Sequence, residues 1–321
     1  MPNPSLAQVN PVNIPLTNVA MKYLLDRDDF VADKVFPPVM VPRSSGSFFV
    51  FDKGDLLRDE MEERAPGTQA KRAGYRLSNT PYMCKDYALS EAIPDERVAD
   101  SVEPINNHED VTEDLIQKYL IKKEKLWAAS YFANGIWTGA ADGAAWNWSQ
   151  AAADPISDIL TLGDTIKSSC GRFPNTLVIG KQAFRMATQS ATVLNRIQYT
   201  QRGAVTKEIL GSLLSDSADQ PMQILVLDGI ENTAAEGQAA TMAQIGDGAS
   251  ALLCYSAPSP GKRRPSAGYQ FIWERFPGGM GPALKTFRDE NIASDIVQLD
   301  VSVDFQVTGA DLGGFQSAIT A

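Results

Sequence analysis

The sequence predicts an α+β fold, and three stretches carry that prediction. Residues 111–133 repeat apolar side chains at intervals of three and four, which is the period of an amphipathic helix. Residues 297–307 alternate apolar and polar side chains without interruption, as a strand with one buried face does. Residues 155–264 combine helices with short apolar strands, which is typical of an α/β lobe.

The N-terminal part of the chain predicts two extended segments. Residues 1–43 are rich in proline and only residues 20–30 look helical, so we expect an arm that is disordered or laid along other surfaces. Residues 44–90 place strands at Ser47–Phe51 and Tyr75–Leu89 around a long charged tip, which predicts an extended hairpin. Such a hairpin is poorly stable alone and needs a neighbour. A mobile charged loop on a monomer is the alternative.

The charges at the tip of this hairpin are the candidate contacts with a neighbouring subunit. They are dense and of both signs, and few apolar residues accompany them that could pack inward. The candidates are Arg58, Glu62, Glu63, Arg64, Lys71 and Arg72.

Residues 91–154 hold the long helix and then a Gly/Ala-rich linker. The helix would be roughly 35 Å long at the usual rise per residue, which makes it a strut. Three tryptophans of this linker, residues 137–153, are more typical of anchors on a core than of a ligand site. They are Trp137, Trp146 and Trp148.

The α/β lobe and the C-terminal segment follow. Asp154-Pro155 predicts a helix start, with Asp as the cap and Pro in the first turn, and Gly171 marks its end. Within 155–264, strands are expected at 176–179, 222–227 and 251–255. Within 265–321, extended segments precede the alternating strand.

Composition narrows the classes of function. The chain has 321 residues, with 29 basic and 39 acidic side chains, so its formal net charge is −10. An acidic chain is not expected to hold nucleic acid over a broad surface. The cysteines Cys84, Cys170 and Cys254 lie far apart, so they predict buried apolar residues of a reducing cytosol rather than a metal or redox site. Neither an export signal nor a membrane-spanning stretch is evident.

Chemistry-bearing motifs are scarce. His108 is the only histidine, and its polar surroundings favour a solvated residue in the first turn of a helix over a catalytic one. The sequence has no phosphate-binding loop, dinucleotide fingerprint or nucleophile elbow. Lys262-Arg263-Arg264 is the one basic cluster; we interpret it as a solvated loop, and contact with DNA or a partner is the alternative. We therefore expect no catalytic, cofactor-binding or metal-binding residues; an α/β enzyme whose site is invisible in sequence is the alternative.

Several segments, in their order along the chain, resemble the major capsid proteins of tailed bacteriophages. The most informative runs from Phe173 to Tyr199, beginning Phe-Pro-Asn-Thr-Leu-Val-Ile-Gly, and resembles the opening of the axial domain in that family. The others are Ala32-Asp-Lys-Val-Phe-Pro-Pro38, Asp154-Pro-Ile-Ser-Asp158 and the strand Asp295–Phe305.

The resemblance implies the tailed-phage major capsid fold over essentially the whole chain. It divides the chain into an N-terminal arm (1–43), an extended loop hairpin (44–90), a spine helix with the first part of a peripheral domain (91–154), an axial domain (155–264) and a return through the peripheral domain (265–321). It leaves open that the last residues, through 310–315, revisit the axial domain.

The implied function is that of a shell subunit. Pentamers and hexamers of the chain would form an icosahedral capsid around double-stranded DNA, without sequence-specific binding to that DNA, and would be assembled in the host cytoplasm as part of the virion. Because the structured part begins within the first fifty residues, a separate scaffolding protein is implied, besides a portal protein; a decoration protein is left open. The shell of a cellular nanocompartment has the same fold and remains the alternative.

Overall fold

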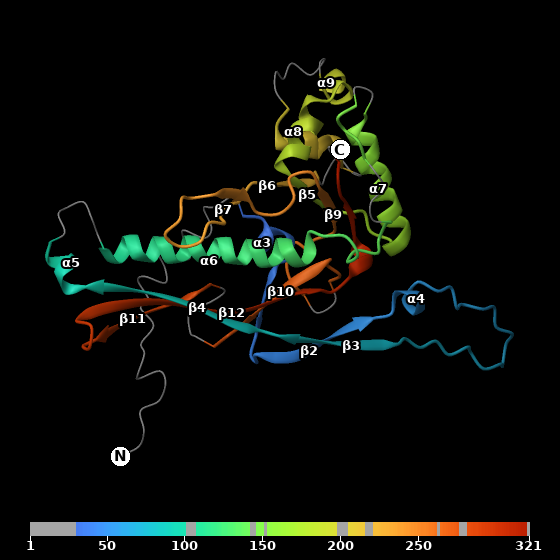
Figure 1. Ribbon diagram of the computed structural model, residues 1–321. Helices are drawn as coiled ribbons and strands as arrows, with labels where there is room; N and C mark the ends of the chain where they lie inside the picture. The colour runs from blue at the N-terminus through green and yellow to red at the C-terminus, as the bar shows by residue number, and fades with distance from the viewer. Residues whose placement is uncertain are drawn as a thin grey trace.

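Two β-sheets and one long helix organise the protein in the computed structural model (Figure 1). One sheet has five strands and lies under the long helix, and the other has four strands and forms a lobe with several helices. A two-stranded ribbon projects away from both. The structure describes residues 30–100, 107–141, 146–150, 153–197, 205–215, 221–261, 264–275 and 281–319.

The five-stranded sheet is built around one long strand, β12, which pairs with three neighbours. Along its length β4 covers one edge, and β11 and then β10 cover the other, with β1 pairing to β10 in parallel. The strands are β1 (Pro38–Val41), β4 (Lys85–Pro94), β10 (Gly268–Trp273), β11 (Ala283–Asp289) and β12 (Ser294–Val307).

The alternation predicted for 297–307 is confirmed by β12. Its apolar residues from 297 to 305 are buried, and Val307 is half-buried. The polar residues of the opposite face bind one another and their neighbours: Asp300 pairs with Lys285 of β11, and Ser302 donates to Asp86 of β4. The polar side chains on this face of β12 therefore find their partners within the subunit.

The helix α6 (Asn107–Tyr131) lies across the apolar face of this sheet (Figure 1). It begins four residues earlier and ends two residues earlier than the periodicity predicts. Its buried stripe meets the apolar side of β12, with Leu115, Ile116 and Leu120 in one cluster with Val297 and Leu299. The short helix α5 (Asp95–Ala99) precedes it.

The second lobe is the α/β lobe that the sequence predicts. Its sheet has the order β13-β9-β5-β6, in which β5 and β6 are parallel and the other pairs antiparallel. The strand β13 comes from the C-terminal segment, so the end of the chain completes this sheet. The elements are α7 (Pro155–Cys170), β5 (Thr176–Gly180), α8 (Lys181–Gln189), α9 (Ala191–Ile197), α10 (Lys207–Leu213), β6 (Gln223–Leu227), β9 (Ala251–Cys254), η1 (Ala310–Leu312) and β13 (Gly313–Gln316).

The predicted boundaries of α7 are confirmed. The side chain of Asp154 accepts a hydrogen bond from the amide of Ser157 at 3.3 Å, which satisfies one of the free amides of the first turn. Gly171 ends the helix with φ of +76°, a left-handed conformation that glycine adopts without steric cost.

Tryptophans anchor the linker between the two sheets, as predicted. Trp137 is buried among residues of both sheets, and Trp148 is buried against the α/β lobe. Trp146 is half-buried and stacks on Trp148 with 5.3 Å between the ring centres. A small hairpin of β7 (Ile230–Asn232) and β8 (Met242–Gln244) forms a separate two-stranded sheet.

The N-terminal segment joins the core at α3 (Ala32–Val35). Val31, Ala32, Val35 and Phe36 are fully buried in the cluster between the two sheets. The residues 1–29 of the expected arm, including the helix-like part before Phe30, lie outside the described residues, as do Lys262 and Arg263 of the basic cluster.

One sequence prediction for the hairpin is wrong. The stretch Tyr75–Leu89 is not one strand but two, β3 (Leu77–Met83) and β4, which separate at Cys84. The amide of Cys84 bonds to the carbonyl of Ser44 at 2.8 Å, and the next residue already pairs with β12. The chain leaves the ribbon here because β12 offers it a longer partner than the ribbon does.

Candidate functional site: the extended loop

The ribbon that carries the charged loop is joined to the body by aromatic contacts at its base. It consists of β2 (Ser45–Phe51) and β3, paired antiparallel from Ser45–Met83 to Phe51–Leu77. The ring of Tyr82 stacks on Phe271 of β10 with 4.6 Å between centres, and Phe48 stacks on the same ring at 5.5 Å. The hairpin prediction is confirmed for these two strands.

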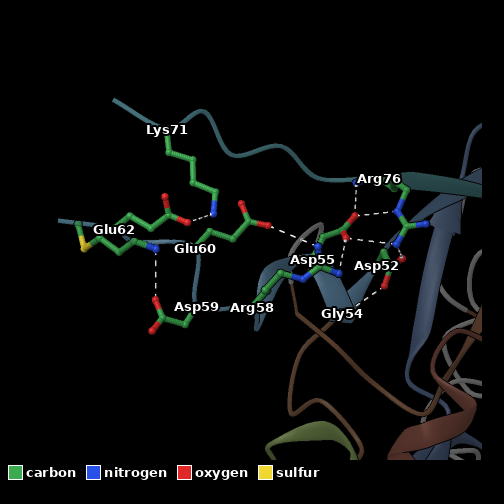
Figure 2. Close-up of polar contacts among 10 residues, drawn as sticks. Asp52, Gly54, Asp55, Arg58, Asp59, Glu60, Glu62, Lys71 and Arg76 are labelled. Carbon is green, nitrogen blue, oxygen red and sulfur yellow. Dashed lines mark hydrogen bonds and ion pairs between the residues drawn. The ribbon is translucent and has the colours of Figure 1, made fainter. Parts of the chain in front are cut away.

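A polar network holds the two sides of the loop together beyond the ribbon (Figure 2). Asp52 caps the short helix α4 (Lys53–Leu56) by accepting from the amide of Gly54 at 2.8 Å. Asp55 accepts from the side chain of Arg76 at 2.9 Å and from its backbone amide at 3.1 Å, and Asp52 pairs with the same guanidinium at 2.9 Å. Hydrogen bonds from Arg76 hold the pKa of Asp55 below its usual value, so this carboxylate stays charged at neutral pH.

The structure brings only some of the six candidate residues together. Arg58 lies between Asp55 at 3.8 Å and Glu60 at 3.6 Å. Glu62 and Lys71 form an ion pair across the tip (Figure 2). The other three candidates, Glu63, Arg64 and Arg72, are exposed and form no ion pair with another described residue. These three charges are consequently available to another molecule.

Apolar residues on the outer face of the ribbon were missed in the sequence. Phe49, Leu77 and Met83 share this face, and they are 64%, 45% and 68% exposed. Leu57 and Met61 of the loop are 70% and 94% exposed. The run Phe48-Phe49-Val50-Phe51 carried the signal, because apolar residues at successive positions place apolar side chains on both faces of a strand.

A second polar cluster, also missed, joins the N-terminal segment to α6. Glu124 is fully buried, and its carboxyl oxygens accept from the amides of Val31 at 3.1 Å and Ala32 at 3.0 Å. The neighbouring Lys123 is buried as well and pairs with Asp33. Burial raises the pKa of Glu124 to about 7, partly offset by the two amides. Lys123 and Glu124 stand among other charged residues of α6, a pattern typical of a solvent-exposed helix face. The sequence therefore offers no sign that these two side chains are buried.

The side chains most often used in catalysis, histidine and cysteine, do not cluster in the described part of the chain. His108 lies half-exposed in the first turn of α6, where its carbonyl accepts from the hydroxyl of Thr112 at 2.7 Å. Burial raises the pKa of the Cys84 thiol to about 11 and that of the Cys254 thiol to about 12, so both stay protonated and unreactive at neutral pH. Among the described residues, no group of three metal-ligating side chains converges, and no helix has the length and apolar content to cross a bilayer.

Comparisons with known proteins identify proteins of similar sequence and fold. No family model matches the chain. The major capsid protein of Burkholderia phage BcepMu is 23% identical over 209 residues, which are 64% of this chain and 66% of that protein. The match thus spans just under two thirds of the relative's length.

Solved structures match over nearly the whole chain. A phage-related protein from Bordetella bronchiseptica RB50 superposes with a TM-score of 0.73 at 20% identity, covering 97% of this chain and 98% of that one. The capsid of cyanophage P-SCSP1u gives 0.52 at 14% identity, covering 92% and 90%. A virus-like particle from Pyrococcus furiosus gives 0.55 at 9% identity, covering 94% and 98%. The chain therefore has the α+β fold of the tailed-phage major capsid proteins, and the resemblance drawn from its sequence is confirmed.

Proposed function

We propose that this chain is the major structural subunit of a phage capsid, an icosahedral shell that encloses double-stranded DNA. The observation that carries the proposal is a capsid fold over nearly the whole chain, with a loop that projects from the body and has few side chains packed against the rest of the subunit. Met61 is 94% exposed and Leu57 70% exposed, which is costly for a monomer unless another subunit covers them. The sequence similarity to a phage major capsid protein supports the same assignment.

Head-to-tail contacts would close the shell. A projecting loop on one side of each subunit makes a heterologous contact, and such contacts generate rings, here of five and six subunits. We propose that the charged tip contributes Arg58, Glu62, Glu63, Arg64, Lys71 and Arg72 to this contact. Each exposed pair is worth under about 1 kcal/mol, but repetition over a shell lets such pairs set register.

The proposal includes the division of the chain and its partners. We divide the chain into an arm (1–43), a loop (44–90), peripheral segments (91–154 and 265–321) and an axial domain (155–264), and the last residues of the chain rejoin the axial domain. The two sheets, the projecting ribbon and the pairing of β13 with β9 support this division. The role is structural and virion-bound, without catalysis by the chain itself. Assembly in the host cytoplasm would need a separate scaffolding protein and a portal protein, with a decoration protein optional. The net charge of −10 suits a shell that contains DNA without gripping it.

Particle size tests the proposal. The purified chain, alone and co-expressed with its scaffold, is analysed by size-exclusion chromatography and negative-stain microscopy. We expect closed particles of many copies. A chain that stays monomeric or dimeric at high concentration in both preparations contradicts the shell function and revives the enzyme alternative.

The likeness to the Pyrococcus particle keeps the cellular nanocompartment as a second candidate. Particles isolated from the native source separate the two functions. Nuclease-protected double-stranded DNA inside them supports the capsid, whereas an enclosed enzyme and no protected DNA supports the nanocompartment.

A further inference from the structure

One lysine ties the loop to a distant part of the subunit. Lys53 begins α4, just beyond the ribbon, and its ammonium donates to the carbonyl of Ser169 at 3.1 Å and pairs with Asp311 at 2.6 Å. Ser169 belongs to the last turn of α7, and Asp311 to η1, so three elements meet at one ammonium group. Figure 1 shows α4 near the end of α7 at which the helix finishes.

The position suits a cation. The last carbonyls of a helix have no intrahelical partner, and they carry the negative end of the helix dipole. Lys53 satisfies one of these carbonyls, that of Ser169, while the carboxylate of Asp311 neutralises it. The side chains are 49% and 25% exposed, so water and salt compete for the contact and it can open at low cost.

The contact controls the whole loop rather than one strand. Asp52 and Asp55, on either side of Lys53, both bind Arg76, which directly precedes β3 on the returning side of the loop, as Figure 2 shows. Whatever fixes α4 therefore fixes both sides of the loop. The base of the ribbon is attached separately, by the aromatic stack on Phe271 and by the amide of Met83, which donates to Asp304 of β12 at 2.9 Å. While the Lys53 contact is closed, the loop is held both at α4 and at the base of the ribbon, whereas the base contacts alone leave the loop free to pivot.

We propose that the Lys53–Asp311 contact is a releasable latch that sets the direction of the loop relative to the α/β lobe. In the free subunit at low salt the Lys53–Asp311 contact is formed. It breaks at high salt, or when the loop takes another direction during assembly. Its use during assembly rests on the proposed shell function, whereas the latch itself is a property of one subunit.

Spin labels measure the direction of the loop in the unassembled full chain. One label at Met61→Cys reports the tip and one at Leu194→Cys reports the α/β lobe, both at exposed positions, with Cys170→Ser removing the partly exposed native thiol. The distance distribution is recorded at low and high salt. We expect one narrow peak for this parent at low salt and a broad distribution at high salt.

Two substitutions open the latch, and one controls for charge. Lys53→Met and Asp311→Asn should each lose the narrow peak at low salt, and Lys53→Arg should keep it. Lys71→Met removes an equal charge from a pair that lies wholly within the loop, so it should leave the peak intact. A narrow peak in Lys53→Met, or equal broadening in Lys71→Met, overturns the latch.

Assembly gives a separate reading. In a particle-forming chain, Lys53→Met should yield particles of more varied size than Lys181→Met does, as counted by electron microscopy. Lys181 pairs with Asp228 outside the loop, so Lys181→Met removes the same charge from a similarly exposed pair. If the parent forms no particles, the shell function fails while the spin-label result still decides the latch. Uniform particles from Lys53→Met confine the latch to the free subunit and overturn its use in assembly.

Discussion

The buried carboxyl of Glu124 predicts an unusual dependence of stability on pH. Its pKa is about 7 in the folded chain against 4.5 for an ordinary glutamate, because the side chain is fully buried between α6 and the segment 31–33. The groups that face it are the amides of Val31 and Ala32, together with the Lys123–Asp33 pair. Since the folded state holds the proton more tightly, folding favours the protonated form.

The sign and size follow from that difference. Below pH 4.5 the carboxyl is protonated in both the folded and the unfolded state, so its full contribution to the free energy of unfolding is present. As the pH rises towards about 7, the unfolded state releases its proton first, so the free energy of unfolding falls. At about 1.4 kcal/mol per pKa unit, the loss is about 3 kcal/mol, and it levels off above the folded pKa.

Glu124→Gln tests this reasoning, because the amide stays neutral at every pH and its oxygen can still accept from Val31 or Ala32. Urea unfolding of the unassembled subunit gives the free energy of unfolding of both proteins between about pH 4 and about pH 8. We expect the difference between them to shift by about 3 kcal/mol in favour of the glutamine as the pH rises. Other titrating groups cancel in this difference.

A matched control is Glu236→Gln, which removes a carboxylate from an exposed loop position and should follow the native curve in parallel. Parallel curves for Glu124→Gln as well would refute the buried site. Glu124→Ala should be destabilising at every pH, since it leaves two buried amides without an acceptor, at about 1–3 kcal/mol each.

Three further predictions concern the sheet, the loop and the histidine. Val301→Asp buries a charge between β12 and α6 at a cost of several kcal/mol, so we expect insoluble protein. The control Ser90→Asp, on the exposed side of β4, should stay soluble. A soluble, folded Val301→Asp protein would mean that the buried face of β12 is misassigned. Glu63→Lys should leave the melting temperature of the subunit nearly unchanged and lower the particle yield or make it salt-dependent, while Glu236→Lys should do neither; unchanged assembly at every salt concentration removes Glu63 from the interface. His108→Ala should fold and assemble normally, and loss of a hydrolytic or transfer activity in that variant would revive the enzyme alternative.

The exposed apolar residues of the ribbon add to the interpretation of the loop. The sequence draws attention to its charges, but Phe49 and Met61 expose apolar area that charges alone do not explain. Burial of such area against a neighbour would supply association free energy, while the charged tip would govern orientation. This division of roles fits the small effect expected for a single charge reversal on the stability of the free subunit.

The sequence by itself determined the elements whose pattern is local. The helix α6 and the strand β12 were predicted because side chains repeat with the period of their own backbone, and that period needs no knowledge of the partner. The start and end of α7 were predicted for the same reason, since a capping aspartate and a left-handed glycine act within one turn.

Only the tertiary structure decided the features that join distant residues. The split of Tyr75–Leu89 at Cys84 depends on the position of β12, which lies more than two hundred residues later in the chain. Lys53 and Asp311 are 258 positions apart, and the burial of Glu124 depends on a segment 92 positions before it. Each of these side chains is charged and looks solvated in its local sequence. The partner that neutralises or buries each side chain comes from a remote segment, which the packing of the two sheets brings close. Such pairing depends on the complete fold, and a short stretch of sequence does not reveal it.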